Sequence, residues 1–239
     1  MATFVLVHGG GHGGWCYKPV AQLLRGMGHE VHAPSLSGLA DRAHLLSSAI
    51  DLETHIDDVA GLLEFEDLTE VVLVGHSYGG MVITGAADRK PGRVGHRVYL
   101  DAAYPRDGES LYEHAYEQIH MARQGLQEVD GVSVVMAPMP GFAAFFGVTD
   151  PQLGAWTDTR LTVQPWKCFE QKIVLQNESA MRAIPESHLI CTSTIPGRDM
   201  ALLQSRSQGR VWDIDTGHDL MLTEPAWVAE RLHAIVQTS

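Results

Sequence analysis

One short turn constrains the fold of this 239-residue chain more than any other feature. Four strand-forming residues, 71–74, run directly into Gly75-His76-Ser77-Tyr78-Gly79, and a helical stretch follows. A serine between a strand and a helix sits on a strained turn, and the residues two positions to either side of it must be small. The simpler interpretation is a glycine-rich turn with an incidental serine, but the flanking strand and helix argue against it. The pattern predicts that Ser77 is a nucleophile at the carboxyl end of a strand.

Apolar strands and helices alternate through most of the sequence, without tight hairpins. The apolar runs are typical of strands buried on both faces of a sheet, and they span 3–8, 97–103, 188–193 and 210–214. Helical stretches follow them, at 17–27, 51–66, 199–207 and from 223 onward. This order is that of βαβ units. We therefore expect a mostly parallel, doubly wound sheet.

The alternation stops between residues 104 and 186. A helix is expected at 109–123, and methionine, proline and aromatic residues follow it without a strand pattern. We interpret 104–186 as a cap inserted over the carboxyl edge of the sheet, with 1–103 and 187–239 forming the core. The simpler role for its aromatic residues is core packing. We favour an apolar pocket above Ser77 lined by some of Phe142, Phe145, Phe146, Trp156, Trp166 and Phe169.

A glycine-rich segment, His8-Gly9-Gly10-Gly11-His12-Gly13-Gly14, follows the first strand. Its glycine spacing formally fits a dinucleotide-binding loop, but no acidic residue closes the second strand at 30–34. We expect instead that the Gly10 amide forms an oxyanion hole with the Tyr78 amide. His8 and His12 have no third ligand near them in the sequence, so hydrogen bonding within the loop is the favoured role. No metal and no organic cofactor are predicted.

A second catalytic candidate lies near the end of the chain. Among the 13 histidines, only His218 combines a late position, a flanking glycine and a place directly after the last strand. The carboxyl ends of parallel strands meet at one edge of a sheet, so His218 should lie near Ser77. We predict that it is the general base that takes the serine proton.

Charge and composition argue against several classes of partner. The formal net charge of −12 repels phosphate backbones, which argues against nucleic acid. Cys16, Cys168 and Cys191 show no metal or redox spacing, which favours free thiols in a reducing compartment. The first residues lack a basic segment, and the apolar run at 4–7 is too short for a signal peptide or a membrane span. We expect a cytoplasmic protein without a membrane partner.

These segments together resemble the α/β-hydrolases, and more narrowly the plant methylesterases and hydroxynitrile lyases with their bacterial esterase relatives. The resemblance covers nearly the whole chain and is weakest in the cap. It is carried by 4–15, 75–80, Cys191-Thr192 and Gly217-His218. It implies that Ser77 attacks an ester carbonyl while His218 takes its proton. The Gly10 and Tyr78 amides would hold the oxyanion, and water would release the acyl group.

Two departures from that group bear on the reaction. The lyases carry a threonine and a lysine where this chain has Gly9 and Asp219. A carboxylate at 219 would repel a departing cyanide, which favours ester hydrolysis. We expect a serine hydrolase for a small, fairly apolar carboxylic ester, a methyl ester or lactone included. A carbon–carbon lyase or a small-molecule binding protein with little turnover are the alternatives, and the oligomeric state is open, a homodimer included.

The catalytic acid is not where the resemblance would place it. Relatives usually carry an aspartate two residues beyond the Cys-Thr pair, and here that place holds Thr194. Asp101 ends the strand beside the nucleophile's, as the acid does in haloalkane dehalogenases and a fungal lactonase, so we predict that it completes the triad. Capping the turn at Tyr104-Pro105 is its simpler role. Asp199 is the main alternative; Asp213, Asp215 and a triad without a carboxylate are weaker ones.

Overall fold

The computed structural model describes residues 1–237, and a six-stranded sheet lies at its centre. The strands are β1 (Thr3–Val7), β2 (Glu30–His32), β3 (Val71–His76), β4 (Val94–Leu100), β8 (Glu186–Cys191) and β9 (Val211–Ile214). They lie in the order β2-β1-β3-β4-β8-β9, and all neighbours run parallel. Because β3 and β4 are adjacent, the residues that follow them, Ser77 and Asp101, reach the same edge of the sheet.

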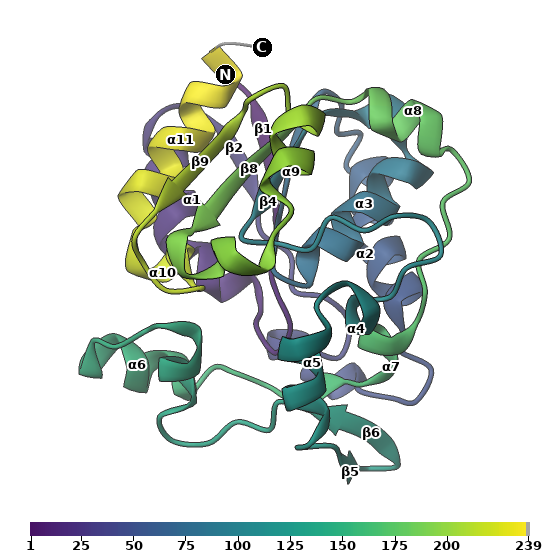
Figure 1. The fold of residues 1–239 in the computed structure, drawn as a ribbon, viewed down its shortest axis with the longest axis vertical. Coiled ribbons are helices and arrows are strands. Elements are labelled where there is room, and N and C mark those ends of the chain that lie inside the picture. The colour runs from purple at the N-terminus through teal and green to yellow at the C-terminus, as the bar shows by residue number, and fades with distance from the viewer. Residues whose placement is uncertain (238–239) are drawn as a thin grey trace.

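Helices cover both faces of this sheet (Figure 1). One face packs against α1 (Lys18–Gly26), α10 (Leu220–Thr223) and α11 (Pro225–Gln237), and the other against α2 (Leu52–Phe65), α3 (Gly79–Arg89) and α9 (Met200–Arg206). Successive residues of β1 accordingly join different clusters: Phe4 packs on the α1 side and Val5 on the α2 side. Burial on both faces explains the apolar runs in the sequence. The predicted doubly wound sheet is confirmed.

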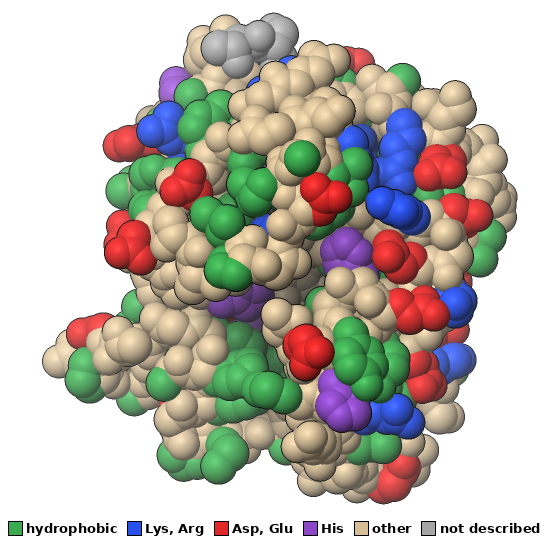
Figure 2. Space-filling view, in the orientation of Figure 1, with side chains coloured by type: hydrophobic (Ala, Val, Ile, Leu, Met, Phe, Trp, Pro, Cys, Tyr) green, Lys and Arg blue, Asp and Glu red, His purple; other side chains and the backbone are tan. Residues whose placement is uncertain are grey.

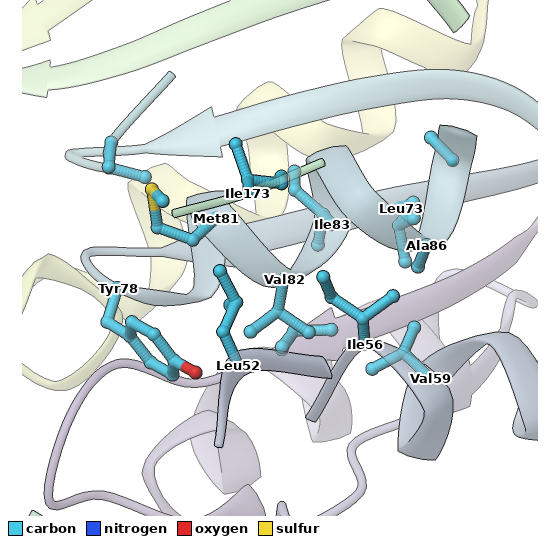
Figure 3. Close-up of a cluster of buried hydrophobic side chains, with 14 of the residues drawn as sticks. Leu52, Ile56, Val59, Leu73, Tyr78, Met81, Val82, Ile83, Ala86 and Ile173 are labelled. Atoms are coloured by element: carbon cyan, nitrogen blue, oxygen red, sulfur yellow. The ribbon is translucent and has the colours of Figure 1, made fainter. Parts of the chain in front are cut away.

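The layer between α2 and α3 fixes the start of α3, where the nucleophile's turn ends. Figure 3 shows Leu52, Ile56 and Val59 of α2 on the side of α3 that carries Val82. The helices approach closely at Gly85, where an added Cβ would lie 2.3 Å from the Cδ1 atom of Ile56. Each fully buried aliphatic side chain here contributes about 1.5–3 kcal/mol. This packing holds the turn before α3 rigidly against the sheet.

The segment between β4 and β8 contains short helices and a second sheet. Its elements are α4 (Leu111–His114), α5 (Tyr116–Arg123), β5 (Gln127–Val129), β6 (Val132–Val135), α6 (Pro151–Asp158), β7 (Gln164–Pro165), α7 (Lys167–Glu170) and α8 (Glu178–Ala183). The three strands form an antiparallel sheet, β5-β6-β7, which the sequence analysis did not predict. In Figure 1, α5, α6, β5 and β6 lie below the main sheet, on the side opposite the two labelled termini.

Short 3-10 turns complete the chain, at Gly14–Tyr17, Ala40–Leu45, Pro91–Arg93, Phe142–Phe146 and Thr192–Gly197. Among these, Phe142–Phe146 and Thr192–Gly197 supply residues to the cavity described below. The final helix packs beside α1, and in Figure 1 its described end lies near the labelled N-terminus, on the side of the main sheet opposite α5 and α6.

Two predicted elements differ from the structure for local reasons. The single helix expected at 109–123 is two helices, because Ala115 leaves the helical conformation at φ −126° and ψ 50°. A capping box between Ser110 and Glu113 begins the first of them. The strand expected at 97–103 ends at Leu100, since Asp101 has a φ of 45° and cannot continue an extended strand.

Candidate active site

Ser77 occupies a strained backbone position at the end of β3. Its φ of 53° lies in the left-handed region, which non-glycine residues enter only when the surroundings enforce it. An added Cβ at Gly75 would lie 2.5 Å from the carbonyl oxygen of Gly79, and one at Gly80 would lie 1.9 Å from that of Ala103. The turn therefore closes only with glycine at these places, and it presents Ser77 at the wall of a cavity.

His218 and Asp101 meet beside this turn. The Nδ1–H of His218 donates a hydrogen bond to Oδ2 of Asp101 at 2.5 Å. The Asp101 side chain is fully buried, whereas 27% of the His218 side chain is exposed. Both residues line the same cavity as Ser77. The contact leaves Nε2 of His218 as the ring nitrogen available for proton transfer.

The second carboxylate oxygen of Asp101 accepts three hydrogen bonds. Its Oδ1 accepts hydrogen bonds from the Cys191 amide at 3.2 Å, the Thr194 hydroxyl at 2.6 Å and the Arg198 guanidinium at 2.8 Å. Burial by itself would raise the pKa of Asp101, but the hydrogen bond and charge of His218 and the charge of Arg198 outweigh it and hold that pKa well below its usual range. The carboxyl group is therefore ionised.

The other candidate carboxylates have different partners. Asp199 caps α9, where its Oδ1 accepts from the Leu202 amide at 2.9 Å. Asp215 accepts from the Thr192 hydroxyl at 3.1 Å, and Asp213 is exposed on β9. Among residues 1–237, none of these three contacts the ring of His218, and the structure brings only Asp101 to it.

The amides predicted for the oxyanion hole lie close to the serine. Gly10 and Tyr78 are buried and line the cavity with Ser77. In the described part of the chain, neither backbone N–H donates to a protein acceptor. A buried N–H group without an acceptor is rare, and it is the feature that an oxyanion site requires.

His8 shapes the loop that carries Gly10. Its Nδ1–H donates to the Gly9 carbonyl at 2.8 Å, and its Nε2 accepts from the Leu36 amide at 3.0 Å. These partners require a neutral ring, and burial lowers the pKa of His8 to about 3. The loop-shaping role expected for His8 is confirmed.

His12 forms a buried ion pair with Asp219. Its Nδ1 lies 2.8 Å from the Gly10 carbonyl and its Nε2 lies 2.9 Å from Oδ2 of Asp219. Both partners only accept hydrogen bonds, so both ring nitrogens must carry protons and His12 is charged. Burial opposes that charge, but Asp219 outweighs it and raises the pKa of His12; burial would likewise raise the pKa of Asp219, and His12 lowers it.

The position of Asp219 corrects one sequence prediction. Its carboxylate was expected to face the departing group, but it is fully buried against His12 and does not line the cavity. The direct repulsion of cyanide that we expected is therefore wrong. The lack of a lysine in the described cavity lining still argues against a lyase. The lyases of the resembled group carry a lysine after the catalytic histidine, and no lysine lines the cavity among the described residues.

The cavity has a volume of about 1010 Å³ and lies between the main sheet and the segment 104–186. Its apolar lining includes Leu111, Ile119, Met136, Phe142, Phe146 and Phe169. Figure 2 shows hydrophobic side chains beside a histidine in the hollow between the two parts. Two of the predicted residues lie elsewhere: Trp156 packs edge-on against Trp15, and Trp166 packs against Tyr112. Their rings fill the structure behind the cavity wall.

The sequence analysis missed Arg198 altogether. Thr194 was considered only as the place where relatives carry the acid, although its hydroxyl contacts Asp101. Both residues reach Asp101 from the Thr192–Gly197 turn and the residue after it. The only hint in the sequence was that Thr194 and Arg198 are four residues apart. This spacing indicates a shared partner only if the segment between them is known to be a turn.

Comparison with known proteins assigns the class. Residues 4–231 match the model of the alpha/beta hydrolase family, and the chain belongs to that family. It is 37% identical to a carbendazim hydrolyzing esterase of Nocardioides sp. (strain SG-4G), over 98% of this chain and 100% of that one. It is 32% identical to methyl jasmonate esterase 1 of Vitis vinifera, over 51% of this chain and 47% of that one. These names support a hydrolase that acts on esters.

Solved structures agree on the fold. An extracellular alpha/beta-hydrolase from a Paenibacillus species superposes with a TM-score of 0.80 at 24% identity, covering 97% of this chain and 98% of that one. Polyneuridine aldehyde esterase superposes with a TM-score of 0.81 at 21% identity, covering 99% of each chain. Within residues 1–237, no helix is long and apolar enough to cross a membrane.

Proposed function

We propose that this protein is a serine esterase in which Ser77, His218 and Asp101 form the catalytic triad. The observation that carries the proposal is the 2.5 Å hydrogen bond from His218 to the ionised Asp101, at the wall of the cavity that Ser77 also lines. A buried carboxylate on one ring nitrogen leaves the other nitrogen free to act as a base. The strained turn at Ser77 adds a nucleophile in the same cavity.

The chemistry follows from this arrangement. The Ser77 oxygen attacks the ester carbonyl while Nε2 of His218 takes its proton, and Asp101 stabilises the imidazolium that forms. The Gly10 and Tyr78 amides donate to the oxyanion. His218 then returns the proton to the departing alcohol, which leaves an acyl group on Ser77. Water, activated by the same histidine, releases the acid and regenerates the enzyme.

The cavity indicates the kind of ester. Its walls are largely apolar, and each charged group that lines it has a partner within the protein: Arg198 pairs with Asp101, and His12 pairs with Asp219. A substrate carrying its own charge would find no free partner among these groups and would lose hydration on entry. We infer a small, uncharged and fairly apolar carboxylic ester, a methyl ester or a lactone included. The relative named as a carbendazim hydrolyzing esterase supports ester hydrolysis as the reaction.

Covalent labelling tests the proposal. A fluorophosphonate should label the wild-type protein at Ser77, and Ser77→Ala should remain unlabelled. A panel of apolar esters and lactones, followed by mass spectrometry, should give an acyl adduct on Ser77. A binding protein with little turnover would bind these compounds without adduct or burst of product. Equal labelling of the Ser77→Ala variant would disprove the assignment.

A further inference from the structure

The triad carboxylate is shared between a histidine and a permanent cation. Oδ2 of Asp101 accepts from His218, and Oδ1 accepts from Arg198 at 2.8 Å. The guanidinium also donates to the Ala102 carbonyl at 3.1 Å and to the Thr194 hydroxyl at 3.2 Å. Only 12% of the Arg198 side chain is exposed. These contacts hold the guanidinium rigidly on the side of Asp101 away from His218.

We propose that Arg198 is a positioning residue that keeps Asp101 ionised and oriented toward His218. This inference rests on the triad proposed above. When His218 acts as the free base its ring carries no charge, so the ring alone would leave a buried carboxylate without a compensating charge. Arg198 supplies that charge. Since arginine does not titrate in proteins, the compensation is permanent.

The same charge opposes protonation of His218. A proton on the ring gains from Asp101, but it also meets the nearby positive charge of Arg198 across the carboxylate. The cation therefore weakens the hold of Asp101 on the imidazolium. Without Arg198, the carboxylate would act on His218 alone and would stabilise the imidazolium more strongly.

Other groups around His218 do not replace this effect. The ring of His76 lies 4.7 Å from that of His218, between centroids, but burial lowers the pKa of His76 to about 3 and it is neutral. The thiol of Cys191 donates to the Gly217 carbonyl, and burial raises its pKa. His12 and Asp219 carry opposite charges and pair with each other. Arg198 is thus the cation held directly on the triad acid.

Thr194 contacts the same carboxylate as Arg198. It stands where the resembled group usually carries its acid, and its hydroxyl donates to the acid that comes from β4 instead. Thr194 and Arg198 together occupy the space next to the carboxylate. Moving the acid to the neighbouring strand has placed it within reach of a cation.

The test is the pH dependence of kcat/KM on a chromogenic short-chain ester, measured from pH 4 to 9. In this profile kcat/KM falls on the acidic side, and we call this part of the curve the acid limb. For Arg198→Met, the pH at the midpoint of the acid limb should move upward by on the order of one pH unit. Arg198→Lys keeps the charge and should restore the limb to near the wild-type position. Arg206→Met is the matched control: Arg206 pairs with Glu186 at 3.1 Å and is 17% exposed, but it does not contact Asp101, so its limb should not move.

The outcomes separate this inference from the proposed function. An acid limb of Arg198→Met that coincides with those of wild type and Arg206→Met would overturn the role of Arg198. If the methionine variant folds poorly, Arg198→Gln and the pH dependence of fluorophosphonate labelling at Ser77 give the same test on small amounts of protein. Wild-type protein that is not labelled at Ser77 would instead defeat the proposed triad.

Discussion

Two histidine–aspartate pairs include the adjacent residues His218 and Asp219, yet the two pairs differ in the exposure of their histidine rings. His218 pairs with Asp101, and His12 pairs with Asp219. Both rings line the cavity, whereas the Asp219 carboxylate does not. The carboxylates are alike in being fully buried, but 27% of the His218 side chain is exposed and only 1% of that of His12. The pairs thus differ mainly in what a substrate can reach.

The hydrogen bonds of the two rings determine whether each ring can take a proton from a substrate. Both nitrogens of His12 donate to protein oxygens, so this ring has no nitrogen left to accept a proton from a substrate. His218 uses one nitrogen for Asp101 and keeps the other. The His12 pair joins the loop that carries Gly10 to the residue that follows His218. We infer that the first pair performs the chemistry and the second holds its two loops together.

Removing the exposed ring should give the largest effect. We expect His218→Ala to lower kcat by on the order of 10³-fold or more, because nucleophile and base act as a unit. Its unfolding free energy should stay near that of wild type, since the ring is partly exposed. Steady-state kinetics and urea unfolding check the two halves of this prediction, and a variant with most of its activity would remove His218 from the triad.

Removing the buried ring should act mainly on stability. His12→Ala leaves the Asp219 carboxylate buried without its charge partner, which typically costs about 3–5 kcal/mol. We expect a loss of this size in urea unfolding, together with a smaller loss of kcat than in His218→Ala. Unchanged stability with abolished activity would mean that His12 is itself part of the chemistry.

The contribution of the His12–Asp219 pair to the unfolding free energy should fall at low pH. The pKa of Asp219 is lowered from 3.8, so its stabilisation is present above that value and is lost as the pH falls through the lower, folded pKa. The pKa of His12 is raised from 6.5, so its contribution is full below that value and is lost as the pH rises through the folded pKa. The pair is therefore strongest between these values. Asp219→Asn should lose less unfolding free energy than wild type between pH 4 and pH 2.

The smallest effect is expected at Asp199, the main alternative acid. Its side chain caps α9, and asparagine caps a helix about as well as aspartate. We expect Asp199→Asn to turn over substrate at nearly the wild-type rate and to lose less than about 1 kcal/mol of stability. A turnover rate lowered by on the order of 10²-fold or more would move the acid from β4 to the later strand.

How far the sequence predicted this molecule depends on the range of the interactions involved. The turn at Ser77 was predictable because glycine spacing and strand patterning are local signals. The neighbourhood of Asp101 and His218 followed from strand order, since Asp101 follows β4, His218 follows β9, and only β8 lies between these strands in the sheet. The sites themselves are proposals that the experiments must test.

The rest depended on contacts between distant segments. The pairing of His12 with Asp219 joins residues 207 positions apart and left no pattern in either segment. The small sheet β5-β6-β7 was missed because its strands have two to four residues each. Arg198 was missed because its partner is reached through a 3-10 turn that the sequence pattern did not indicate.

The most direct measurement compares the two carboxylates in one assay. The second-order rate constant for fluorophosphonate labelling at Ser77 reports how well the base activates the serine. We predict that Asp101→Asn lowers it by on the order of 10²-fold or more, because the histidine loses its orienting charge. Folded Asp219→Asn should stay within several-fold of wild type. Slow labelling of Asp219→Asn beside normal labelling of Asp101→Asn would contradict the assignment of the chemistry to the exposed pair.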